Sequence, residues 1–453
     1  MTEKILFHIK RYIPRRLFRA LRPAYHFFFA WWAAFTYGFP SRHMTVIGVT
    51  GTKGKTTVVE LLHALLEASG VKVASSSSLR FRIGEREVRN EKKMTMPGRL
   101  FVQRFLYDAF RAGCAYVVIE VPSEGIAQFR HRFIDFDIAV MTNVAPEHIE
   151  SHGSFERYLR AKLDLFWRLP KEGIAVVNRD DPFFERFLAA TPAHVVSYSR
   201  AGIQRNGSVL PVRDLALTED RIRFSLGSAE MDSPLVGEFN FMNILAATAV
   251  AMSQHVALEK IAAGISRVSG VPGRMEMIQR EPFRVVVDYA HTPDSLKAVY
   301  KTVIEFNELR SSHTHQLINS STHKLICVLG AAGGGRDTWK RPVMGKIAAE
   351  FCNEIILTDE DPYDENPAAI IDDIEAGFSQ TLNPKPKTLN PRKILDRREA
   401  IRAALRNAKE GDTVVITGKG AEPWMMGPNG TKIPWDDRAV TREEAALLRD
   451  ESR

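Results

Sequence analysis

The segment GVTGTKGKTT, residues 48–57, decides the fold of this chain. It lies between MTVIGV (44–49), expected to be a buried strand, and TTVVELLHALLEASG, expected to be a helix. Glycines let backbone N–H groups close around a phosphate, and the N-terminus of the helix favours its charge. The full G-x-x-x-x-G-K-[ST] pattern is not met, because residue 49 is valine and Gly48 comes one position early. Gly-Lys-Thr-Thr after a strand still predicts a nucleotide-binding loop.

The loop supplies distinct roles for its side chains. Lys55 is expected to reach the outer phosphates of ATP, and Thr56 to ligate Mg²⁺. The residues predicted to contact the nucleotide here are Gly51, Thr52, Lys53, Gly54, Lys55, Thr56 and Thr57.

Further short apolar runs, AYVVIEV (115–121), FDIAVMTNV (136–144) and GIAVVN (173–178), alternate with helical segments and predict a parallel α/β sheet. Ligands bind beyond the carboxyl ends of such strands, where Glu120 and His148 stand. Alone, Glu120 is more often a solvated carboxylate and His148 a capping or core histidine. Lys162, on an amphipathic helix, is alone more often a surface lysine. Glu120, His148 and Lys162 are candidate site residues only because all three occur together.

The chain is long enough for more than one domain. Residues 200–235 predict a small β excursion, and SGVPGRM (269–275) predicts a joint, after which the α/β rhythm restarts. We expect an N-terminal helical arm (1–43), a central ATP-binding domain (44–273) and a C-terminal domain (274–453). The predicted fold class is α/β: a P-loop ATPase domain with a parallel sheet, followed by a Rossmann-like domain.

Charge is concentrated at one end of the chain. Net charge is +8, and residues 1–43 hold eight Lys/Arg and one acid. The basic balance therefore does not indicate a nucleic-acid-binding body. Cys114, Cys327 and Cys352 show no metal or disulfide spacing, which favours a reducing cytoplasm.

The arm contains HFFFAWWAAFTYGFP. Its apolar run from Phe27 to Phe35 is nine residues, against the ~20 needed to span a bilayer. It has no signal-peptide cleavage site. Two alternatives stay open: a helix lying on an anionic membrane surface, or an arm packed on the body. We expect a monomer.

Many ordered segments resemble the Mur ligase family across about residues 44–453, and most closely its muramyl-tripeptide synthetase branch. The resemblance implies an ATP-dependent ligase of peptidoglycan synthesis. The segments are GVTGTKGKTT, EVPSEG, TNVAPEHIESHGSFERYLRAKLDLF, GEFNFMN, VPGRME, VVVDYAHTPDSL, GGGRDTWKRP, DRREAI, GKGAE and WDDR.

The resemblance also implies roles for residues. Glu120 and His148 match ligands of a second metal ion, and Lys162 matches a lysine that carries a carbamate beside the metals. The remaining matches are to nucleotide-contacting positions: Asn143, Asn243, Arg274, Asp288 and His291.

The implied chemistry is phosphoryl transfer from ATP, with two Mg²⁺ ions, onto the carboxylate of a muramyl-peptide acceptor. The amino group of a free amino acid then attacks the acyl phosphate. Closure of the C-terminal domain would exclude water. The expected location is the cytoplasm, with peripheral contact to the inner membrane through the arm. The alternatives are a ligase acting on a folate-like, polymeric or lipid-linked acceptor, and a non-catalytic nucleotide-binding scaffold at the membrane.

The resemblance has departures near the acceptor. Because the phosphate loop starts at residue 51, we expect no uridine-nucleotide domain before it. Thr95 in MTMPGR and Ser123 in EVPSEG match acceptor-side positions, whereas Met96, Pro122 and Glu124 replace the usual residues.

Amino-acid selection is the second departure. Arg336, Gly418 and Glu422 match positions around the incoming amino acid. In LTDEDPYDENP (357–367), Asp361 and Tyr363 stand where diaminopimelate enzymes have asparagine and an arginine that binds a second carboxylate. Asp361 and its acidic neighbours are candidates to meet an ammonium group. The sequence therefore predicts a ligase that disfavours diaminopimelate and favours a basic amino acid such as lysine.

Overall fold

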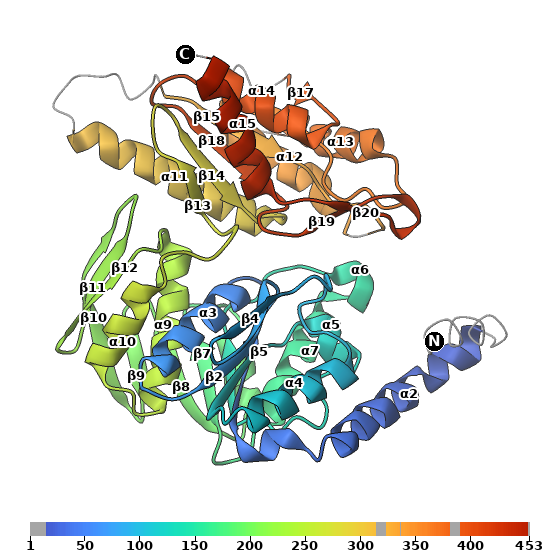
Figure 1. Ribbon diagram of the computed structural model, residues 1–453, viewed down its shortest axis with the longest axis vertical. Coiled ribbons are helices and arrows are strands. Elements are labelled where there is room, and N and C mark those ends of the chain that lie inside the picture. Colours follow the sequence, from blue (N-terminus) through green and yellow to red (C-terminus); the bar gives the residue numbers. More distant parts are fainter. Residues whose placement is uncertain (1–14, 314–322, 336, 381–389, 452–453) are drawn as a thin grey trace.

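The computed structural model describes residues 15–313, 323–335, 337–380 and 390–451. They build two α/β bodies, each around its own sheet, with the C-terminal body above the central one in Figure 1. The segment between the last helix of the first body and the first strand of the second joins them. The predicted fold class is therefore confirmed.

The central sheet of the described chain has twelve strands in the order β12-β11-β10-β9-β8-β7-β6-β1-β5-β2-β3-β4. The six from β8 to β2 in that order pair in parallel, and the strands at both ends are antiparallel. The strands are β1 (Thr45–Thr50), β2 (Val73–Ser76), β3 (Arg80–Ile83), β4 (Arg86–Arg89), β5 (Tyr116–Glu120), β6 (Ile138–Met141), β7 (Ile174–Asn178), β8 (His194–Ser199), β9 (Gly202–Arg205), β10 (Ser208–Leu217), β11 (Ile222–Leu226) and β12 (Ala229–Ser233).

Helices cover both faces of this sheet because its strands alternate two sets of apolar side chains. Ile47 and Val49 of β1 pack toward α3 (Lys55–Glu67), α9 (Glu238–Ser253) and α10 (Leu258–Arg267). Val46 packs into the opposite cluster, formed with α4 (Arg99–Arg111), α5 (Ser123–Ala127), α7 (Phe155–Trp167) and α8 (Phe184–Ala190). A short helix, α6 (Ile149–His152), precedes α7.

The predicted β excursion is strands β9 to β12, and they continue the central sheet. Ile222, Phe224 and Leu226 alternate with more exposed residues along β11 and are fully buried in the cluster formed with α9 and α10. Burial of one face explains why this segment alternates in sequence while the central strands do not.

The C-terminal sheet has the order β13-β14-β18-β15-β16-β17 in the described chain. Helices α11, α12 and α13 cover one face, and α14 and α15 the other. The elements are β13 (Glu276–Gln279), β14 (Arg284–Asp288), α11 (Pro293–His313), β15 (Leu325–Leu329), α12 (Lys340–Phe351), β16 (Glu354–Leu357), α13 (Pro367–Glu375), β17 (Arg392–Lys393), α14 (Arg397–Asn407), β18 (Thr413–Thr417), the hairpin β19 (Trp424–Met426) and β20 (Lys432–Pro434), and α15 (Asp437–Glu451); the 3-10 turns η2 (Phe378–Gln380) and η3 (Pro428–Gly430) complete them.

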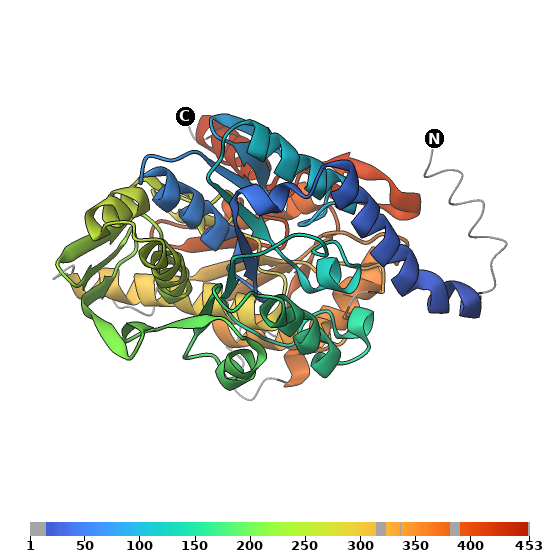
Figure 2. The same cartoon turned by 90° about the horizontal axis from the view of Figure 1, so that it is seen from below.

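The N-terminal arm forms α2 (Arg15–Thr36), followed by η1 (Pro40–His43). Its small residues Ala30, Ala33 and Ala34 are buried, and the helix lies against α4. Figure 2 shows its N-terminal end extending beyond the central body. Within the described ranges, no helix is both long and apolar enough to cross a bilayer.

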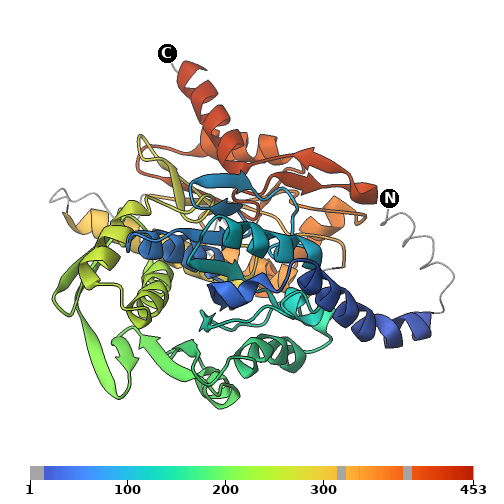
Figure 3. The ribbon, with the colours of Figure 1, turned by 60° about the horizontal axis from the view of Figure 1, so that its bottom comes forward.

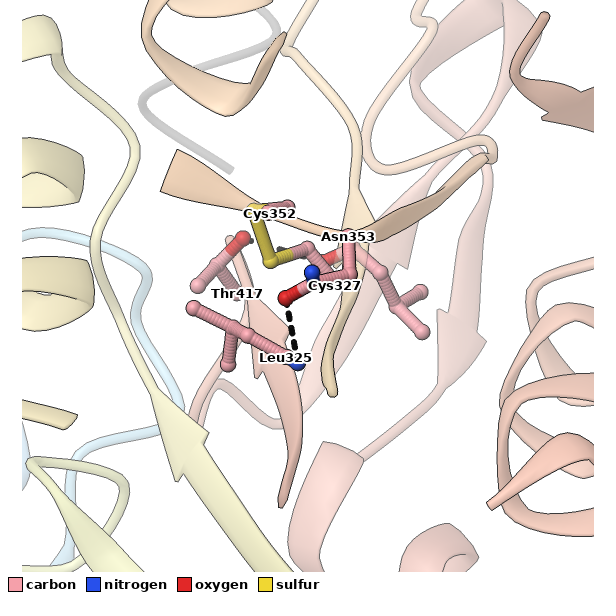
Figure 4. Close-up of a disulfide and its surroundings, with 6 residues drawn as sticks. Leu325, Cys327, Cys352, Asn353 and Thr417 are labelled. Atoms are coloured by element: carbon pink, nitrogen blue, oxygen red, sulfur yellow. Dashed lines mark hydrogen bonds between the residues drawn. A yellow bond between two sulfur atoms is a disulfide. The ribbon is translucent and has the colours of Figure 1, made fainter. Parts of the chain in front are cut away.

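The prediction that the cysteines form no disulfide is wrong for one pair. Cys327 of β15 and Cys352, directly after α12, are disulfide-bonded (Figure 4), and Cys114 is free and buried. The chain leaves β15, passes through α12 and returns beside its starting strand, where Leu325 and Asn353 exchange hydrogen bonds. A crossover of this kind pairs cysteines that are 25 residues apart, which a search for short spacings does not detect.

Candidate active site

The phosphate loop lies between β1 and α3, as predicted. Gly51 and Gly54 have φ values of 150° and 84°, within the region that favours glycine. A Cβ on Gly51 would stand 1.8 Å from the Thr142 hydroxyl, and one on Gly54 would stand 2.2 Å from Asn243 Oδ1. The loop therefore needs glycine both for its backbone and for the side chains packed against it.

Residues after β6 hold the loop in shape. The N–H of Lys53 donates to Asn143 Oδ1 (2.9 Å), and Asn143 Nδ2 donates back to the Lys53 carbonyl (3.1 Å). The Thr142 hydroxyl donates to the same carbonyl (2.6 Å). Thr52 bonds the Tyr158 hydroxyl at 2.7 Å, and Thr57 is buried in the first turn of α3. The loop is thus organised by the protein itself.

Lys55 lies across this loop. Its Nζ donates to the carbonyls of Gly51 and Thr52, both at 2.9 Å. Burial lowers the pKa of Lys55, although Glu120 and Glu147 oppose the change. A phosphate group would offer this ammonium stronger acceptors than two carbonyls do.

Oxygen atoms suited to a hard cation gather at the start of α3. Ser78 donates to Glu120 through both its N–H and its hydroxyl, each at 3.0 Å. The same hydroxyl is 3.5 Å from the Thr56 hydroxyl and 3.3 Å from the Thr95 hydroxyl. Glu120 is fully buried at the end of β5.

These oxygens suit a Mg²⁺ ion that also binds phosphates and water, rather than a metal ion that protein side chains hold alone. In the part of the chain that the structure describes, no three or more His, Cys, Asp or Glu side chains group to hold a metal. Mg²⁺ usually takes one or two protein oxygens and completes its shell with phosphates and water. Thr56 and Glu120 supply such oxygens here.

Lys162 is a buried lysine and not a surface one. Its Nζ donates to the Gly51 carbonyl at 2.7 Å and lies 4.5 Å from the centre of the Tyr158 ring. Burial lowers the pKa of Lys162 well below its ordinary value. The side chain is therefore held next to the phosphate loop in conditions that favour a neutral amine.

The C-terminal domain reaches the loop through His291. Lys53 Nζ is 2.9 Å from Glu147 Oε1 and 3.3 Å from His291 Nε2. Burial lowers the pKa of His291 to about 4, and burial lowers the pKa of Lys53 to about 8 while Glu147 opposes it. Burial would raise the pKa of Glu147, but Lys53 and the histidines hold it well below its ordinary value.

His148 lies at a second contact between the domains. Its backbone N–H donates to Asp337 Oδ2 (2.7 Å), and the N–H of Glu150 donates to Asp337 Oδ1 (3.3 Å). The His148 ring is partly exposed, 3.9 Å from Glu124. Nearby, Ser123 bonds His152 Nε2 at 3.1 Å. A role of His148 as a metal ligand stays a prediction.

The other residues predicted to contact the nucleotide come from α9, from the joint and from β14. Asp288 accepts the N–H groups of Met275 and Ala290, both at 2.7 Å, and burial raises its pKa. The Arg274 guanidinium lies 4.1 Å from the centre of the Tyr289 ring. Asn243, from α9, packs against Gly54 on the other side of the loop.

The acidic loop after β16 is already paired with lysines. Asp361 accepts from Lys93 Nζ (2.7 Å) and from Lys419 Nζ (3.0 Å to each oxygen). Glu422 accepts from Lys419 (2.5 Å) and from the Tyr289 hydroxyl (2.8 Å). We call Lys93, Asp361, Lys419 and Glu422 the charged cluster. The sequence had suggested that Asp361 meets the ammonium group of a substrate. In the structure, lysines of the chain itself already pair with Asp361.

Two neighbours complete this region. Glu360 is buried, and a Cβ on Gly418 would stand 2.5 Å from its Oε2. Tyr363 has φ 53°, and its N–H donates to the Met426 carbonyl (3.1 Å). Arg336 lies outside the described residues.

Sequence reasoning missed five contributors: Ser78, Lys93, Glu147, Asp337 and Lys419, the last of which lies inside the quoted motif GKGAE. Glu147 and Asp337 lie inside quoted motifs, next to His148 and Arg336, so their positions offered a signal. Ser78 and Lys93 offered none, because their partners are 42 and 268 residues away.

Known proteins resemble the chain over nearly all of its length. Residues 49–251 match the Mur ligase middle domain, and residues 273–420 match the Mur ligase glutamate ligase domain. A UDP-N-acetylmuramoyl-L-alanyl-D-glutamate--2,6-diaminopimelate ligase of Gloeobacter violaceus is 40% identical over 91% of this chain and 79% of its own length. A UDP-N-acetylmuramyl-tripeptide synthetase of Roseiflexus sp. is 39% identical over 92% and 81%.

Solved structures agree with this. The structure of a UDP-N-acetylmuramoyl-L-alanyl-D-glutamate--2,6-diaminopimelate ligase superposes with a TM-score of 0.57 at 30% identity, covering 90% of this chain and 79% of that one. Folylpolyglutamate synthase of Mycobacterium tuberculosis has a TM-score of 0.64 at 19% identity, covering 92% and 93%, and shares the fold. The chain belongs to the Mur ligase family of ATP-dependent, amide-bond-forming ligases.

Proposed function

We propose that this ligase joins the amino group of a free amino acid to the carboxylate of a muramyl-peptide acceptor in the cytoplasm. The relatives named above act, by their names, at this step of peptidoglycan precursor synthesis. The observation that carries the proposal is the meeting of the two domains at the phosphate loop, where Lys53 contacts both Glu147 and His291.

The residues support the following order of events. The acceptor carboxylate attacks the γ-phosphorus of ATP, forming an acyl phosphate and releasing ADP. The amine then attacks the acyl carbon, the amide forms, and phosphate leaves with the carbonyl–phosphate bond broken and a proton lost from nitrogen. Lys55 and the backbone N–H groups of the loop offset charge on the phosphates.

Metal binding is the finer part of this proposal. We place one Mg²⁺ beside Thr56 and a second beside Glu120, with His148 and a carbamylated Lys162 as its further partners. When bound, Mg²⁺ supplies positive charge to the phosphate oxygens. Lys162 supports the carbamate assignment because its burial favours the neutral amine, the form that reacts with carbon dioxide.

The direct test is phosphate release from the purified full chain with ATP, Mg²⁺, UDP-N-acetylmuramoyl-L-alanyl-D-glutamate and single amino acids. Release should require acceptor and amino acid together, with product mass confirming the amide. Lys55→Met should abolish release, whereas Lys171→Met, at an exposed position outside the site, should not.

Other outcomes point elsewhere. Release with a folate-like or polymeric acceptor but not with the muramyl peptide would replace the acceptor in this proposal. No release with any pair, despite ATP binding, would favour the scaffold alternative.

We also propose that α2 holds the enzyme against an anionic membrane surface. Residues 15–22 contain four arginines, and the helix then exposes a run of aromatic side chains. An aromatic helix beside a basic segment suits the interface of an anionic bilayer. The exposed aromatics are Tyr25, Phe27, Phe28, Phe29, Trp31, Trp32 and Phe35.

Vesicle sedimentation tests this contact. Phosphatidylcholine vesicles with added phosphatidylglycerol should retain the protein, and salt should weaken retention. Trp32→Ala should reduce it, while Trp167→Ala, on α7 and similarly exposed, should not. Equal binding of all proteins to neutral and anionic vesicles would contradict the proposal.

A further inference from the structure

The turn at residues 147–150, which we call the histidine turn, takes its shape with help from the C-terminal domain. His148 has φ 56° and ψ 27°, a left-handed conformation that is uncommon for a residue other than glycine. It precedes α6, a helix of four residues whose first turn receives no capping hydrogen bond from the His148 side chain. A helix this short is not stable by itself in water. Figure 1 shows α6 on the side of the central body that faces the C-terminal body.

Asp337 provides the missing acceptors from the other domain. Its Oδ2 accepts the N–H of His148 (2.7 Å), and its Oδ1 accepts the N–H of Glu150 (3.3 Å). The Asp337 side chain is buried. The free N–H groups at the start of a helix favour a negative charge. The Asp337 carboxylate is therefore a helix cap that is supplied across the domain interface.

The contact is reciprocal. Glu150 Oε1 accepts the N–H of Thr338 (3.1 Å) and the hydroxyl of the same residue (3.4 Å). Each domain thus offers one carboxylate to backbone N–H groups of the other. Because these hydrogen bonds are directional, the two carboxylates together specify one relative position of the two segments.

The histidine turn is also tied to the phosphate loop. Glu147 Oε1 lies 2.9 Å from Lys53 Nζ, and His291 Nε2 lies 3.3 Å from the same oxygen. The centre of the His148 ring is 6.4 Å from that of the Tyr158 ring on α7. Glu147 therefore joins the turn to the nucleotide-binding loop, while the C-terminal domain holds the backbone of the turn.

We propose that Asp337 is a positioning residue for phosphoryl transfer. By capping the histidine turn when the domains close, it fixes the backbone of His148, so that the His148 ring faces the phosphates of ATP only in the closed enzyme. The inference rests on the proposed function, which places His148 beside the second Mg²⁺, and it adds the contact through which closure reaches that residue. Transfer of the γ-phosphoryl group then waits for the C-terminal domain, and the acyl phosphate forms where water is already excluded.

The domains have other contacts that do not involve Asp337. Arg89, at the end of the β3–β4 hairpin, pairs with Asp436 (3.0 Å) and donates to the Ala421 carbonyl (3.0 Å). Figure 3 shows this hairpin rising toward the C-terminal body. Closure as a whole therefore does not depend on Asp337 alone, and a substitution there tests the histidine turn.

The experiment compares Asp337→Asn with Asp412→Asn in the full chain. Asparagine keeps the size of the side chain but has one acceptor oxygen where two N–H groups need acceptors. Asp412 is the matched control, because its buried carboxylate also accepts two backbone N–H groups, those of Lys324 (2.8 Å) and Lys409 (2.9 Å). It lies directly before β18, at the opposite end of that strand from the site.

The first measurement needs no turnover. Hydrogen exchange is followed by mass spectrometry in the peptide covering residues 147–152, with a non-hydrolysable ATP analogue bound. Exchange should be about tenfold faster in Asp337→Asn than in the wild type, because the capped N–H groups lose their acceptors. Asp412→Asn should leave exchange in this peptide unchanged.

The second measurement is phosphate release. In Asp337→Asn, kcat should fall on the order of 10- to 100-fold while KM for ATP stays within about twofold, because the phosphate loop still binds the nucleotide. Asp412→Asn should change neither value. Glu150→Gln, at an exposed position where folding is not at risk, should give a smaller change of the same kind.

Three results would overturn the inference. Equal exchange in Asp337→Asn and the wild type would show that the turn keeps its shape without Asp337. An equal fall in kcat in Asp412→Asn would show a general loss of stability. A higher KM for ATP with kcat unchanged would show that Asp337 acts on nucleotide binding instead.

The proposed function and this inference fail in different ways. If the wild type released no phosphate with any acceptor and amino acid, the proposed function would fail. The exchange comparison would still decide whether Asp337 shapes the histidine turn.

Discussion

Glu360 offers a sharp test of the acidic loop, through the substitution Glu360→Gln. Its side chain is buried, and Oε2 has no hydrogen-bond partner among the described residues. Burial raises the pKa of Glu360 to about 7, with Arg397 and Lys419 opposing that rise. Glutamine keeps the shape of the side chain and carries no charge at any pH.

The magnitude follows from the two protonation states. Between pH 4.5 and about 7 the unfolded chain releases a proton that the folded chain keeps. Stability therefore falls as pH rises through this window, and the loss is complete above pH 7. At 1.36 kcal/mol for each pH unit, the interval of about 2.5 units corresponds to about 3 kcal/mol. Glu360→Gln should remove this loss.

Urea unfolding at pH 5, 6, 7 and 8 provides the assay. The variant should match the wild type near pH 5 and exceed it by up to about 3 kcal/mol at pH 8. Glu410→Gln, at an exposed carboxylate, should follow the wild type throughout. A difference between Glu360→Gln and the wild type that does not change with pH would refute the reasoning.

Three further changes have defined outcomes. Asp437→Ala leaves the fully buried Arg397 guanidinium without its ion partner and should cost about 3–5 kcal/mol, measured as a fall of roughly 10 °C in melting temperature. Gly51→Ala places a Cβ against Thr142 and should weaken ATP binding more than tenfold by calorimetry. Cys352→Ser opens a 25-residue loop and should cost about 3 kcal/mol in urea without reductant, and much less with it.

Matched changes separate these effects from general damage. Arg406→Ala removes an exposed ion pair with Glu451 and should cost under about 1 kcal/mol. Gly270→Ala, where a Cβ meets nothing within 4 Å, should leave ATP binding intact. Similar losses in either control would count against the assignment that it accompanies.

Local chemistry was predictable from the sequence, and contacts between distant segments were not. The phosphate loop follows from a glycine pattern, and the parallel α/β sheet around β1 follows from apolar runs that alternate with helical segments. The backbone of the loop needs glycine at Gly51 and Gly54 for local reasons, so the spacing of the glycines was enough to predict their role. Glu120, at the end of β5, was found because the carboxyl ends of parallel strands share one edge.

The charged cluster shows why contacts between distant residues were not predicted from the sequence. The acidic run 359–361 indicated negative charge, but the lysines that neutralise it come from positions 93 and 419. Only the closed arrangement of the domains pairs them. The Cys327–Cys352 bond has the same origin, since a crossover through α12 brings the two sulfur atoms together.

The interface between the domains is largely a set of charges and backbone hydrogen bonds. Lys93 with Asp361, Arg89 with Asp436, and Asp337 with the N–H of His148 all cross it. An interface of this polarity separates and re-forms at low cost, and dissolved ions weaken its partly exposed members. Ionic strength should therefore control how readily the two domains of this enzyme separate. Moderate salt should speed product release, and high salt should slow turnover because it disfavours the closed, productive state.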